Sequence, residues 1–204
     1  HTGDPSLYGA IFEQMAELNK LSIPFTVIPG VTAAFAAAAS MKMEFTLPEI
    51  SQTLILTRMA GRTPVPELEN LRSLTSHKTS IAIYLSINLI EEVEKILAES
   101  YGNDAMCAVA YKVSQPEEQI FNVTVKELVQ TVKKHNIKSQ ALIIAGRVLD
   151  IKLDQIKHKS KLYDHSFPHQ YRNKGLDYGK KDNKIDNNNK SKSKNINYLY
   201  IVGI

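Results

Sequence analysis

Between residues 53 and 146 of this 204-residue chain, short apolar segments alternate with longer segments whose apolar residues recur every three or four positions. The short segments predict buried strands, and the longer ones predict amphipathic helices. We expect strands at residues 53–57, 80–85, 107–111, 119–123 and 141–145. We expect helices at residues 64–74, 88–100 and 124–135. Strands that alternate with helices of ten or more residues predict an α/β fold with largely parallel strand pairing.

Two of these helices begin with the pattern of a capping box, in which a polar side chain and a glutamate three residues later satisfy free backbone N–H groups. The pairs are Asn88 with Glu91 and Thr124 with Glu127. The remaining helix has Pro64 at its start, where a missing N–H costs nothing. Each expected helix therefore has a local start signal as well as a hydrophobic pattern.

A similar alternation precedes this region. The apolar residues within 7–18 recur at helical spacing and predict a helix. Residues 25–28 (FTVI) predict a short buried strand, which Pro29-Gly30 would end. Thr32 is expected to open an alanine-rich helix over residues 33–40, whose small side chains would let it lie close to a sheet or a ligand.

The net charge of +4 is unevenly distributed along the chain. Residues 151–196 hold 12 Lys and Arg against 5 Asp and Glu, whereas residues 1–150 hold 13 against 16. The part with a globular pattern is therefore mildly acidic, and neither basic stripes nor RNA-type aromatic motifs occur in it. We expect no nucleic-acid partner, and we interpret the basic segment as a solvated linker.

The single cysteine, Cys107, excludes an internal disulfide framework and lies in an apolar run that predicts burial. This is consistent with a reducing cytoplasm. No apolar run reaches the roughly 18 residues that a membrane-spanning helix needs, so we expect no membrane partner. The histidines show no metal-ligand spacing, and we expect no protein-bound metal.

Three loops carry candidate binding groups, because ligands of open α/β sheets bind beyond the carboxyl ends of strands. In the first, Gly3 permits close backbone approach and Asp4 offers a carboxylate, although Asp4 could instead cap the following helix. In the second, Thr32 could cap a helix, bind a ligand or do both. In the third, Arg58 and Arg62 could hold a carboxylate or phosphate, although exposed loop arginines often bind nothing.

Taken together, the three loops point to one protein family much more specifically than any one of them does alone. The segments HTGDPSLYGAI and VIPGVTAAFAAAA resemble the tetrapyrrole methylase family. Within it, QTLILTRMAGRTPVPELENL and YKVSQPEEQI resemble the branch that methylates precorrin-4 or its cobalt complex at carbon 11. Residues 160–169 resemble the C-terminal end of the cobalt form, and the whole resemblance covers roughly residues 1–174.

The resemblance implies two α/β subdomains with mostly parallel sheets, a cofactor cleft between them, and a homodimer. It implies S-adenosylmethionine as the methyl donor. Carried over onto this sequence, the cofactor-binding positions are Thr2, Gly3, Asp4, Leu7, Thr32, Ala33, Leu85 and Val113. We predict that Arg58 and Arg62 grip the carboxylates of the tetrapyrrole substrate. The chemistry needs alignment in a dry cleft more than a general base, so we name no catalytic residue.

The resemblance implies methylation of precorrin-4 or cobalt-precorrin-4 at carbon 11 in cobalamin biosynthesis. The alternatives are another tetrapyrrole methylase reaction, at a different precorrin carbon, on uroporphyrinogen or in diphthine synthesis, and a noncatalytic ligand-binding module. The loop from Arg58 to Glu67 disfavours the other methylase reactions, and the lack of a GxGxxG pattern disfavours a dinucleotide-binding module.

The same resemblance predicts the domain organisation. Residues 1–46 would be the remainder of an N-terminal methylase subdomain whose first strand and Gly/Pro-rich loop lie upstream, so that this segment alone would be inactive. Residues 47–150 would form the C-terminal subdomain. A C-terminal extension, an Asn/Lys-rich linker and the possible first strand of a second, fused methylase would follow at residues 151–174, 175–196 and 197–204.

Overall fold

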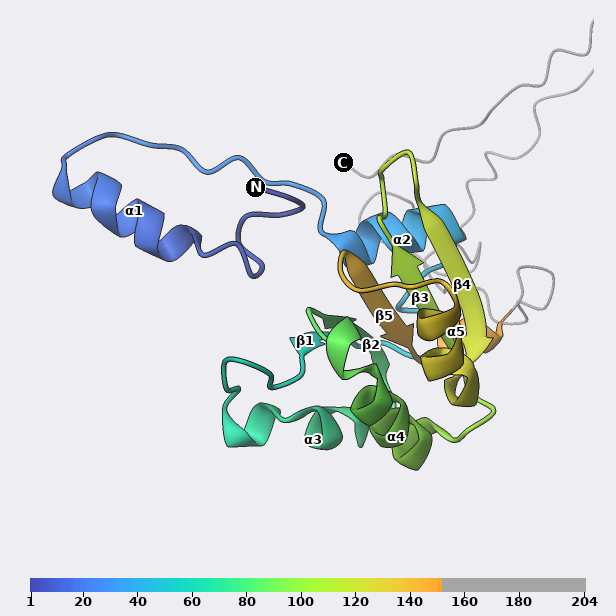
Figure 1. Ribbon diagram of the computed structural model, residues 1–204. Coiled ribbons are helices and arrows are strands. Elements are labelled where there is room, and N and C mark those ends of the chain that lie inside the picture. Colours follow the sequence, from blue (N-terminus) through green and yellow to red (C-terminus); the bar gives the residue numbers. More distant parts are fainter. Residues whose placement is uncertain (152–204) are drawn as a thin grey trace, which may run out of the picture. The chain divides into compact units, whose positions relative to one another are not determined.

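The computed structural model describes residues 1–151 (Figure 1). Its α-helices are α1 (Ile11–Lys20), α2 (Ala33–Met41), α3 (Leu71–Thr75), α4 (Ile90–Tyr101) and α5 (Leu128–Lys134). Its strands are β1 (Leu54–Arg58), β2 (Ser80–Tyr84), β3 (Met106–Tyr111), β4 (Gln119–Thr124) and β5 (Ala141–Ala145). Short 3₁₀ turns lie at Glu67–Glu69, Ile87–Leu89, Val125–Glu127 and Arg147–Asp150. The α/β class and the five strands between residues 53 and 146 are confirmed.

The five strands form one mixed sheet in the order β1-β2-β5-β3-β4. Only β1 and β2 pair in parallel, and the other three pairs are antiparallel, so the predicted largely parallel pairing is wrong. The helices do connect strands that run in the same direction, as crossovers must. However, β5 inserts between β2 and β3, and the short link from β3 to β4 closes a hairpin. The helix–strand alternation therefore predicts strand direction but not which strands are neighbours.

The two faces of the sheet bury side chains of different size. One face presents Ile81, Ile83, Val109 and Ile143 to a core that α3, α4 and α5 complete. The other face presents mainly alanines of β2 and β3 to the alanines of α2, with Leu142 and Ile144 of β5 beside them. Small side chains on both partners allow α2 to pack closely against this face, as the alanine-rich sequence predicts.

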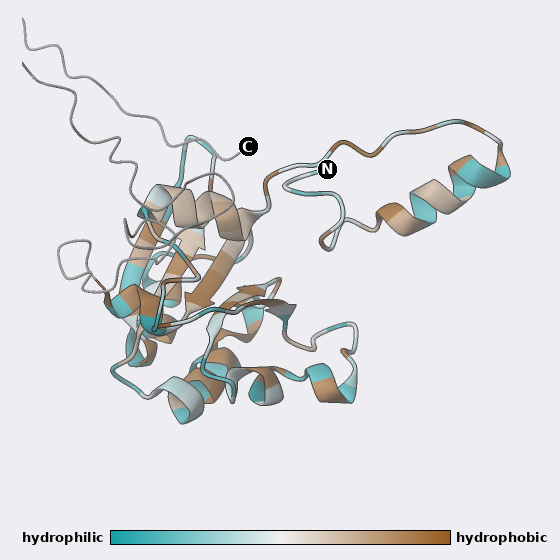
Figure 2. Cartoon of the chain, turned by 180° about the vertical axis from the view of Figure 1, so that it is seen from behind, coloured by the Kyte–Doolittle hydropathy of each residue, from teal (hydrophilic) through white to brown (hydrophobic). Residues whose placement is uncertain are grey.

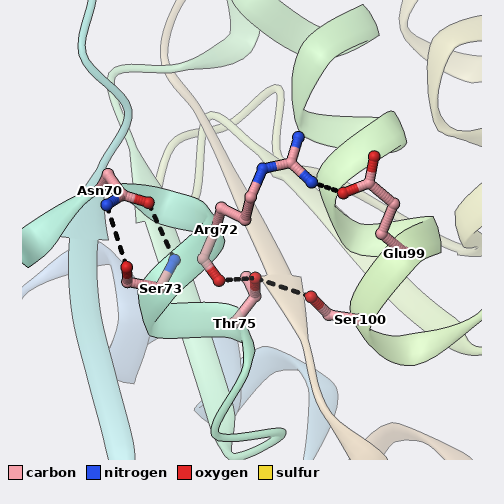
Figure 3. Close-up of polar contacts among 6 residues, drawn as sticks. All are labelled: Asn70, Arg72, Ser73, Thr75, Glu99 and Ser100. Carbon is pink, nitrogen blue, oxygen red and sulfur yellow. Dashed lines mark hydrogen bonds and ion pairs between the residues drawn. The ribbon is translucent and has the colours of Figure 1, made fainter.

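The expected single helix over residues 64–74 is instead a 3₁₀ turn followed by α3. Asn70 separates them with an extended backbone, and its side-chain oxygen accepts a hydrogen bond from the Ser73 N–H at 2.9 Å. Asparagine favours such N-cap positions over helix interiors. Figure 3 shows this cap, the ion pair from Arg72 to Glu99 of α4, and the 2.9 Å hydrogen bond from Ser100 to Thr75. These polar contacts join α3 to α4.

The two expected capping boxes have different outcomes. The box of Thr124 and Glu127 is confirmed, and the Glu127 carboxylate accepts the Thr124 N–H at 2.8 Å. The box at Asn88 is wrong, because a 3₁₀ turn precedes α4 and no side chain caps that helix. Glu91 forms an ion pair with Lys133 of α5 at 2.6 Å instead.

Residues 1–31 pack differently from the rest, and none of them is buried. The first helix begins at Ile11 because Tyr8 and Ala10 adopt left-handed backbone conformations. The predicted buried strand at residues 25–28 is wrong: no strand among residues 1–151 pairs with it, and Ile28 is 74% exposed. Figure 2 shows hydrophobic stretches on this extended segment before α2.

The predicted boundary between subdomains at residues 46 and 47 stays a prediction. The predicted linker and following strand at residues 175–196 and 197–204 lie outside the described residues, as does nearly all of the predicted extension at 151–174.

Candidate cofactor-binding site

The first two predicted loops meet each other through Asp4. One carboxylate oxygen accepts the Gly30 N–H at 2.9 Å, and the other accepts the Ser6 N–H at 2.8 Å. The bond from Gly30, followed by that from Ser6, lowers the pKa of Asp4 below its ordinary value. Asp4 lies well before α1 and does not cap it. Its carboxylate therefore joins two loops that are 26 residues apart in sequence.

Two glycines allow these loops to touch. Gly3 has a φ of +73°, a backbone conformation that residues with a side chain rarely adopt. A Cβ atom on Gly30 would lie 2.2 Å from the Gly3 carbonyl oxygen, so any larger residue there would push the backbones apart. The contact requires glycine at position 30 for space and at position 3 for conformation.

Tyr84, the last residue of β2, connects the second loop to the sheet. Its hydroxyl oxygen accepts the Ala34 N–H at 2.9 Å and lies 2.8 Å from the Thr32 hydroxyl. Thr32 occupies the N-cap position of α2, but its side chain does not cap that helix. Tyr84 satisfies one of the free N–H groups at the start of α2 in its place.

A cavity of about 390 Å³ lies where these elements meet. It is bordered by residues that follow β2 and β3, residues that precede β5, the start of α2, and the first loop. Because β5 runs antiparallel to β2 and β3, its amino end lies at the same sheet edge as their carboxyl ends. The volume falls within the roughly 300–1,000 Å³ of small-molecule sites.

All eight predicted cofactor-binding residues line this cavity: Thr2, Gly3, Asp4, Leu7, Thr32, Ala33, Leu85 and Val113. The first two predicted loops therefore border one and the same cavity. Several lining residues were missed by the sequence reasoning, namely Tyr8, Tyr84, Asn88, Lys112, Gln115, Lys138 and Gln140. An aromatic residue with a polar tip at the end of a predicted strand was the signal that could have identified Tyr84.

The backbone around the cavity is locally strained. Tyr8, Leu85, Lys112 and Gln140 line it and have φ values between 48° and 57°. The left-handed conformation costs a residue other than glycine about 1–2 kcal/mol, and such residues cluster at functional sites. Leu85 is also 71% exposed, which is unusual for a leucine beside a buried strand. Strain and exposure at one edge of the sheet support this cavity as the binding site.

The predicted substrate-binding arginines do not line the cavity. Arg58 donates hydrogen bonds to carbonyl oxygens of its own loop, at 3.1 Å to Thr63 and 2.6 Å to Pro64. A third bond, of 3.4 Å, reaches the Met59 carbonyl, which leaves two of the five guanidinium donors for an anion. Arg62 is exposed. Arg58 thus shapes the loop, and substrate binding by either arginine stays a prediction.

Tyr8 belongs to the wall of the cavity, and its ring lies 5.5 Å from the Tyr84 ring. Partial burial raises the pKa of Tyr8, and the positive charge of Arg58 partly offsets that rise. The two tyrosines together give the cavity an aromatic wall.

Other chemistry is not evident among residues 1–151. That part of the chain contains no cluster of three or more His, Cys, Asp or Glu able to hold a metal ion. Cys107 is buried, and burial raises its pKa to about 12, so its thiol is not a nucleophile at neutral pH. None of the helices within these residues has the length and apolarity to cross a membrane.

A second cavity of about 350 Å³, between α1 and residues 25–30, shares only Gly3 with the predicted site residues.

The profile of the tetrapyrrole (corrin/porphyrin) methylases matches residues 1–129. Together with this fold and cavity, the match shows that the chain belongs to the tetrapyrrole methylase family. It is 50% identical over 173 residues to the cobalt-precorrin-4 C(11)-methyltransferase of Methanocaldococcus jannaschii, covering 84% of this chain and 66% of the relative. It is 44% identical to the enzyme of the same name from Priestia megaterium, of which it covers 67%. The precorrin-4 C(11)-methyltransferase of Pseudomonas aeruginosa is also 44% identical, over 149 residues that cover 73% of this chain and 60% of that relative.

Solved structures agree with this family. An X-ray structure of a cobalt-precorrin-4 methyltransferase superposes with a TM-score of 0.70 at 45% identity, covering 74% of this chain and 64% of that one. A uroporphyrin-III C-methyltransferase from Thermus thermophilus, complexed with S-adenosylhomocysteine, shares the fold with a TM-score of 0.59 at 19% identity, covering 74% of this chain and 65% of that one. The chain spans about two thirds of the length of the two curated cobalt-precorrin-4 relatives.

Proposed function

We propose that the protein containing this chain transfers a methyl group from S-adenosylmethionine to carbon 11 of cobalt-precorrin-4. The observation that carries the cofactor assignment is the meeting of the Gly3-Asp4 and Gly30–Ala33 loops at one cavity. The substrate assignment is supported by the 50% and 44% identity to relatives that bear this activity in their names.

The cavity suits a ligand such as S-adenosylmethionine, which combines a flat aromatic base at one end with a ribose, a sulfonium centre and a charged amino-acid group. Apolar side chains from three elements, Leu7, Ala33 and Leu85, border it beside polar groups such as Thr32 and Lys112. Gly3 lines the cavity and has no side chain, so a ligand can approach its backbone closely. These features support a site that binds a nucleoside-like molecule mainly by shape.

Bound S-adenosylmethionine would supply an electrophilic methyl group, whose bond to sulfur breaks as a bond to the macrocycle carbon forms. The electron pair stays on sulfur, and the positive charge passes to the macrocycle, which then releases a proton to solvent, so that its net gain is one CH₂ unit. The residues of this chain then have to hold the donor in one orientation and keep water away from it. Such positioning contributes up to about 7–11 kcal/mol in favourable intramolecular cases. Asp4 supports the positioning of the donor indirectly. Its two carboxylate oxygens accept backbone N–H groups of Gly30 and Ser6, so they hold the two loops of the site together.

The test is a methyl-transfer assay with the protein expressed from its whole natural reading frame. Cobalt-precorrin-4 and metal-free precorrin-4 are offered separately with S-adenosylmethionine carrying a ¹³C-methyl group. We expect a product heavier by one CH₂ unit, with the label at carbon 11 and faster turnover of the cobalt substrate. Transfer to another carbon, or to uroporphyrinogen in preference to both, would contradict the proposal.

The metal-free substrate is the second candidate, because the Pseudomonas aeruginosa relative named for precorrin-4 is also 44% identical. The ratio of kcat/KM for the two substrates decides between them.

A homodimer and a cytoplasmic location stay predictions. The buried Cys107 is consistent with a reducing compartment.

A further inference from the structure

The turn that joins β3 to β4, residues 112–118, forms one wall of the cavity. It lies within the segment YKVSQPEEQI, which resembles the carbon-11 branch of the family. Two cations, Lys112 and Lys138, line the cavity, and Asp4 is the one acid among the described residues that line it. The Asp4 carboxylate already accepts two backbone N–H groups. This wall is therefore complementary to an anionic group of a ligand.

The backbone of Lys112 is fixed on two sides. Its N–H donates to the Gln140 carbonyl oxygen at 2.9 Å, which ties the turn to the residues before β5. Its carbonyl oxygen accepts the Gln115 N–H at 3.0 Å. Lys112 and Gln140 have φ values of 48° and 53°, and such left-handed conformations persist only where surrounding contacts hold them. The lysine side chain therefore starts from a defined position beside the cavity.

Two adjacent glutamates of this turn have different contacts. The Glu118 carboxylate accepts the Ser114 N–H at 2.7 Å and a hydrogen bond from the Ser40 side chain of α2, and these bonds lower the pKa of Glu118. Figure 1 shows the turn beside α2. A carboxylate oxygen of Glu117 lies 3.8 Å from the Lys112 Nζ. Glu118 therefore holds the turn in place, and Glu117 is the anion that faces Lys112.

The ion pair of Lys112 with Glu117 is loose. Its 3.8 Å separation exceeds the distance of about 2.7–2.9 Å of a charge-assisted hydrogen bond. The ammonium group also lies 5.6 Å from the centroid of the Tyr111 ring, a cation–π contact that supplies no oxygen acceptor. Among residues 1–151 it donates no hydrogen bond, although its side chain is only 26% exposed. A ligand carboxylate in the cavity would gain the hydrogen bond that Glu117 does not make.

We propose that Lys112 binds a carboxylate of a ligand in this cavity, and that Glu117 pairs with the ammonium group only until that carboxylate replaces it. This inference rests on the proposed function and deepens it. Two ligands carry the required group: S-adenosylmethionine in its amino-acid part, and the tetrapyrrole in its acetate and propionate side chains. In either case a loose ion pair is exchanged for a direct hydrogen bond, and no covalent bond changes.

The test uses the protein expressed from its whole natural reading frame. Calorimetry gives the affinity for S-adenosylhomocysteine, and the methyl-transfer assay gives KM for cobalt-precorrin-4. Lys112→Gln should weaken one of these ligands about tenfold, as loss of a charge-assisted hydrogen bond does. Glu117→Gln should strengthen the same ligand about two- to threefold, because it removes a weak competing ion pair. In the double variant the gain from Glu117→Gln should vanish, because its effect requires the lysine.

The ligand that responds identifies the source of the carboxylate. If the methyl donor supplies it, Lys112→Gln weakens S-adenosylhomocysteine but not its decarboxylated analogue, 5′-(3-aminopropylthio)-5′-deoxyadenosine. If the tetrapyrrole supplies it, the affinity for S-adenosylhomocysteine is unchanged and KM for cobalt-precorrin-4 rises about tenfold. Lys112→Arg retains the charge and should keep most of the binding in both cases.

Lys126 and Asp104 provide the matched controls. They also form an ion pair between a lysine and an acid, and neither lines the cavity. Lys126→Gln and Asp104→Asn therefore make the same changes of charge and should leave the binding of both ligands unchanged.

Three outcomes overturn the inference. The first is unchanged binding of both ligands in Lys112→Gln. The second is equal weakening of S-adenosylhomocysteine and its decarboxylated analogue, without a change in KM for cobalt-precorrin-4. The third is the lack of any gain in Glu117→Gln, which holds even if Lys112→Gln fails to fold, because Glu117 is 61% exposed. If the wild-type protein neither binds S-adenosylhomocysteine nor transfers a methyl group, the proposed function falls together with this inference; in the other three outcomes the proposed function stands.

Discussion

Residues 1–31 and residues 32–151 border the same cavity but are held in place in different ways. The first region supplies Thr2, Gly3, Asp4 and Leu7, yet none of its residues is buried, and its first loop is tied by Asp4 and the glycine contact to Gly30 of the same region. The second region supplies Leu85 and Val113, which follow β2 and β3, two strands whose central side chains are buried. One wall of the site is therefore held by a folded core and the other by a few backbone contacts. We therefore expect substitutions in the two regions to affect ligand binding and folding stability to different degrees.

The largest effect should come from the core. Ile83 of β2 is fully buried one residue before Tyr84, and Ile83→Ala leaves a cavity in the larger of the two cores. We expect a loss of about 2–5 kcal/mol in the free energy of unfolding, measured in urea. Affinity for S-adenosylhomocysteine in the remaining folded protein should fall much less. A stability loss under 1 kcal/mol would show that the described core does not hold the site.

At the contact between Gly3 and Gly30 we expect a large loss of activity and only a small loss of stability. Gly30→Ala places a Cβ atom 2.2 Å from the Gly3 carbonyl oxygen and must separate the two loops by close to an ångström. Misplacement on that scale can lower kcat/KM by about 100-fold, while the melting temperature should hardly change. Gly61→Ala is the control for cofactor affinity, because its nearest neighbour would be the Leu89 side chain at 3.5 Å. A large fall in melting temperature for Gly30→Ala would erase the distinction between the two regions.

A smaller effect is expected at the arginine loop. Arg58→Lys removes the planar fork that holds the carbonyls of Thr63 and Pro64 together. We expect KM for the tetrapyrrole to rise about tenfold, with affinity for S-adenosylhomocysteine unchanged. Arg62→Ala should raise the same KM without any change in melting temperature, because Arg62 is exposed. Equal weakening of both ligands in either variant would contradict the assignment of this loop to the substrate.

The smallest effect should be the pH dependence of the first region. The folded protein lowers the pKa of Asp4, so its link to Gly30 is present above the ordinary carboxyl pKa and is lost as the pH falls through the lowered value. Hydrogen-exchange protection of the Gly30 amide should therefore decline below about pH 4. In Asp4→Asn the protection should be lower but independent of pH over this range. Loss of protection in strands β2 and β3 at the same pH would point to global unfolding instead.

Much of the fold was predictable because its signals are local. The strand positions follow from apolar runs bounded by turns, and the Thr124–Glu127 box needs only residues three apart. The helix over residues 64–74 and the strand at 25–28 were wrong for different reasons. Asn70 prefers to cap a helix, and an apolar segment becomes a strand only when another strand supplies hydrogen bonds.

The residues of the candidate site also fall into those that local sequence signals predict and those that depend on distant contacts. Six of the cofactor residues, Thr2, Gly3, Asp4, Leu7, Thr32 and Ala33, came from motifs of neighbouring residues, because a backbone turn built from Gly, Pro, Asp and Thr lies within one short segment. Leu85 and Val113 were aligned only by the strands that precede them. Tyr84 was missed because its role lies in contacts with Thr32 and Ala34, far away in sequence. Arg58 was expected to bind substrate, and its bonds to its own loop depend on the folded path of residues 59–64.

The family, the strands and the turns that border the cavity could be inferred from the order of residues, since each depends on neighbouring residues. The insertion of β5 between β2 and β3, the contact of the loops at Asp4 and Gly30, and the replacement of Thr32 by Tyr84 as the cap of α2 became visible only in the folded chain. Hydrogen bonds and close contacts form between groups that are neighbours in space, and these groups lie far apart in the sequence.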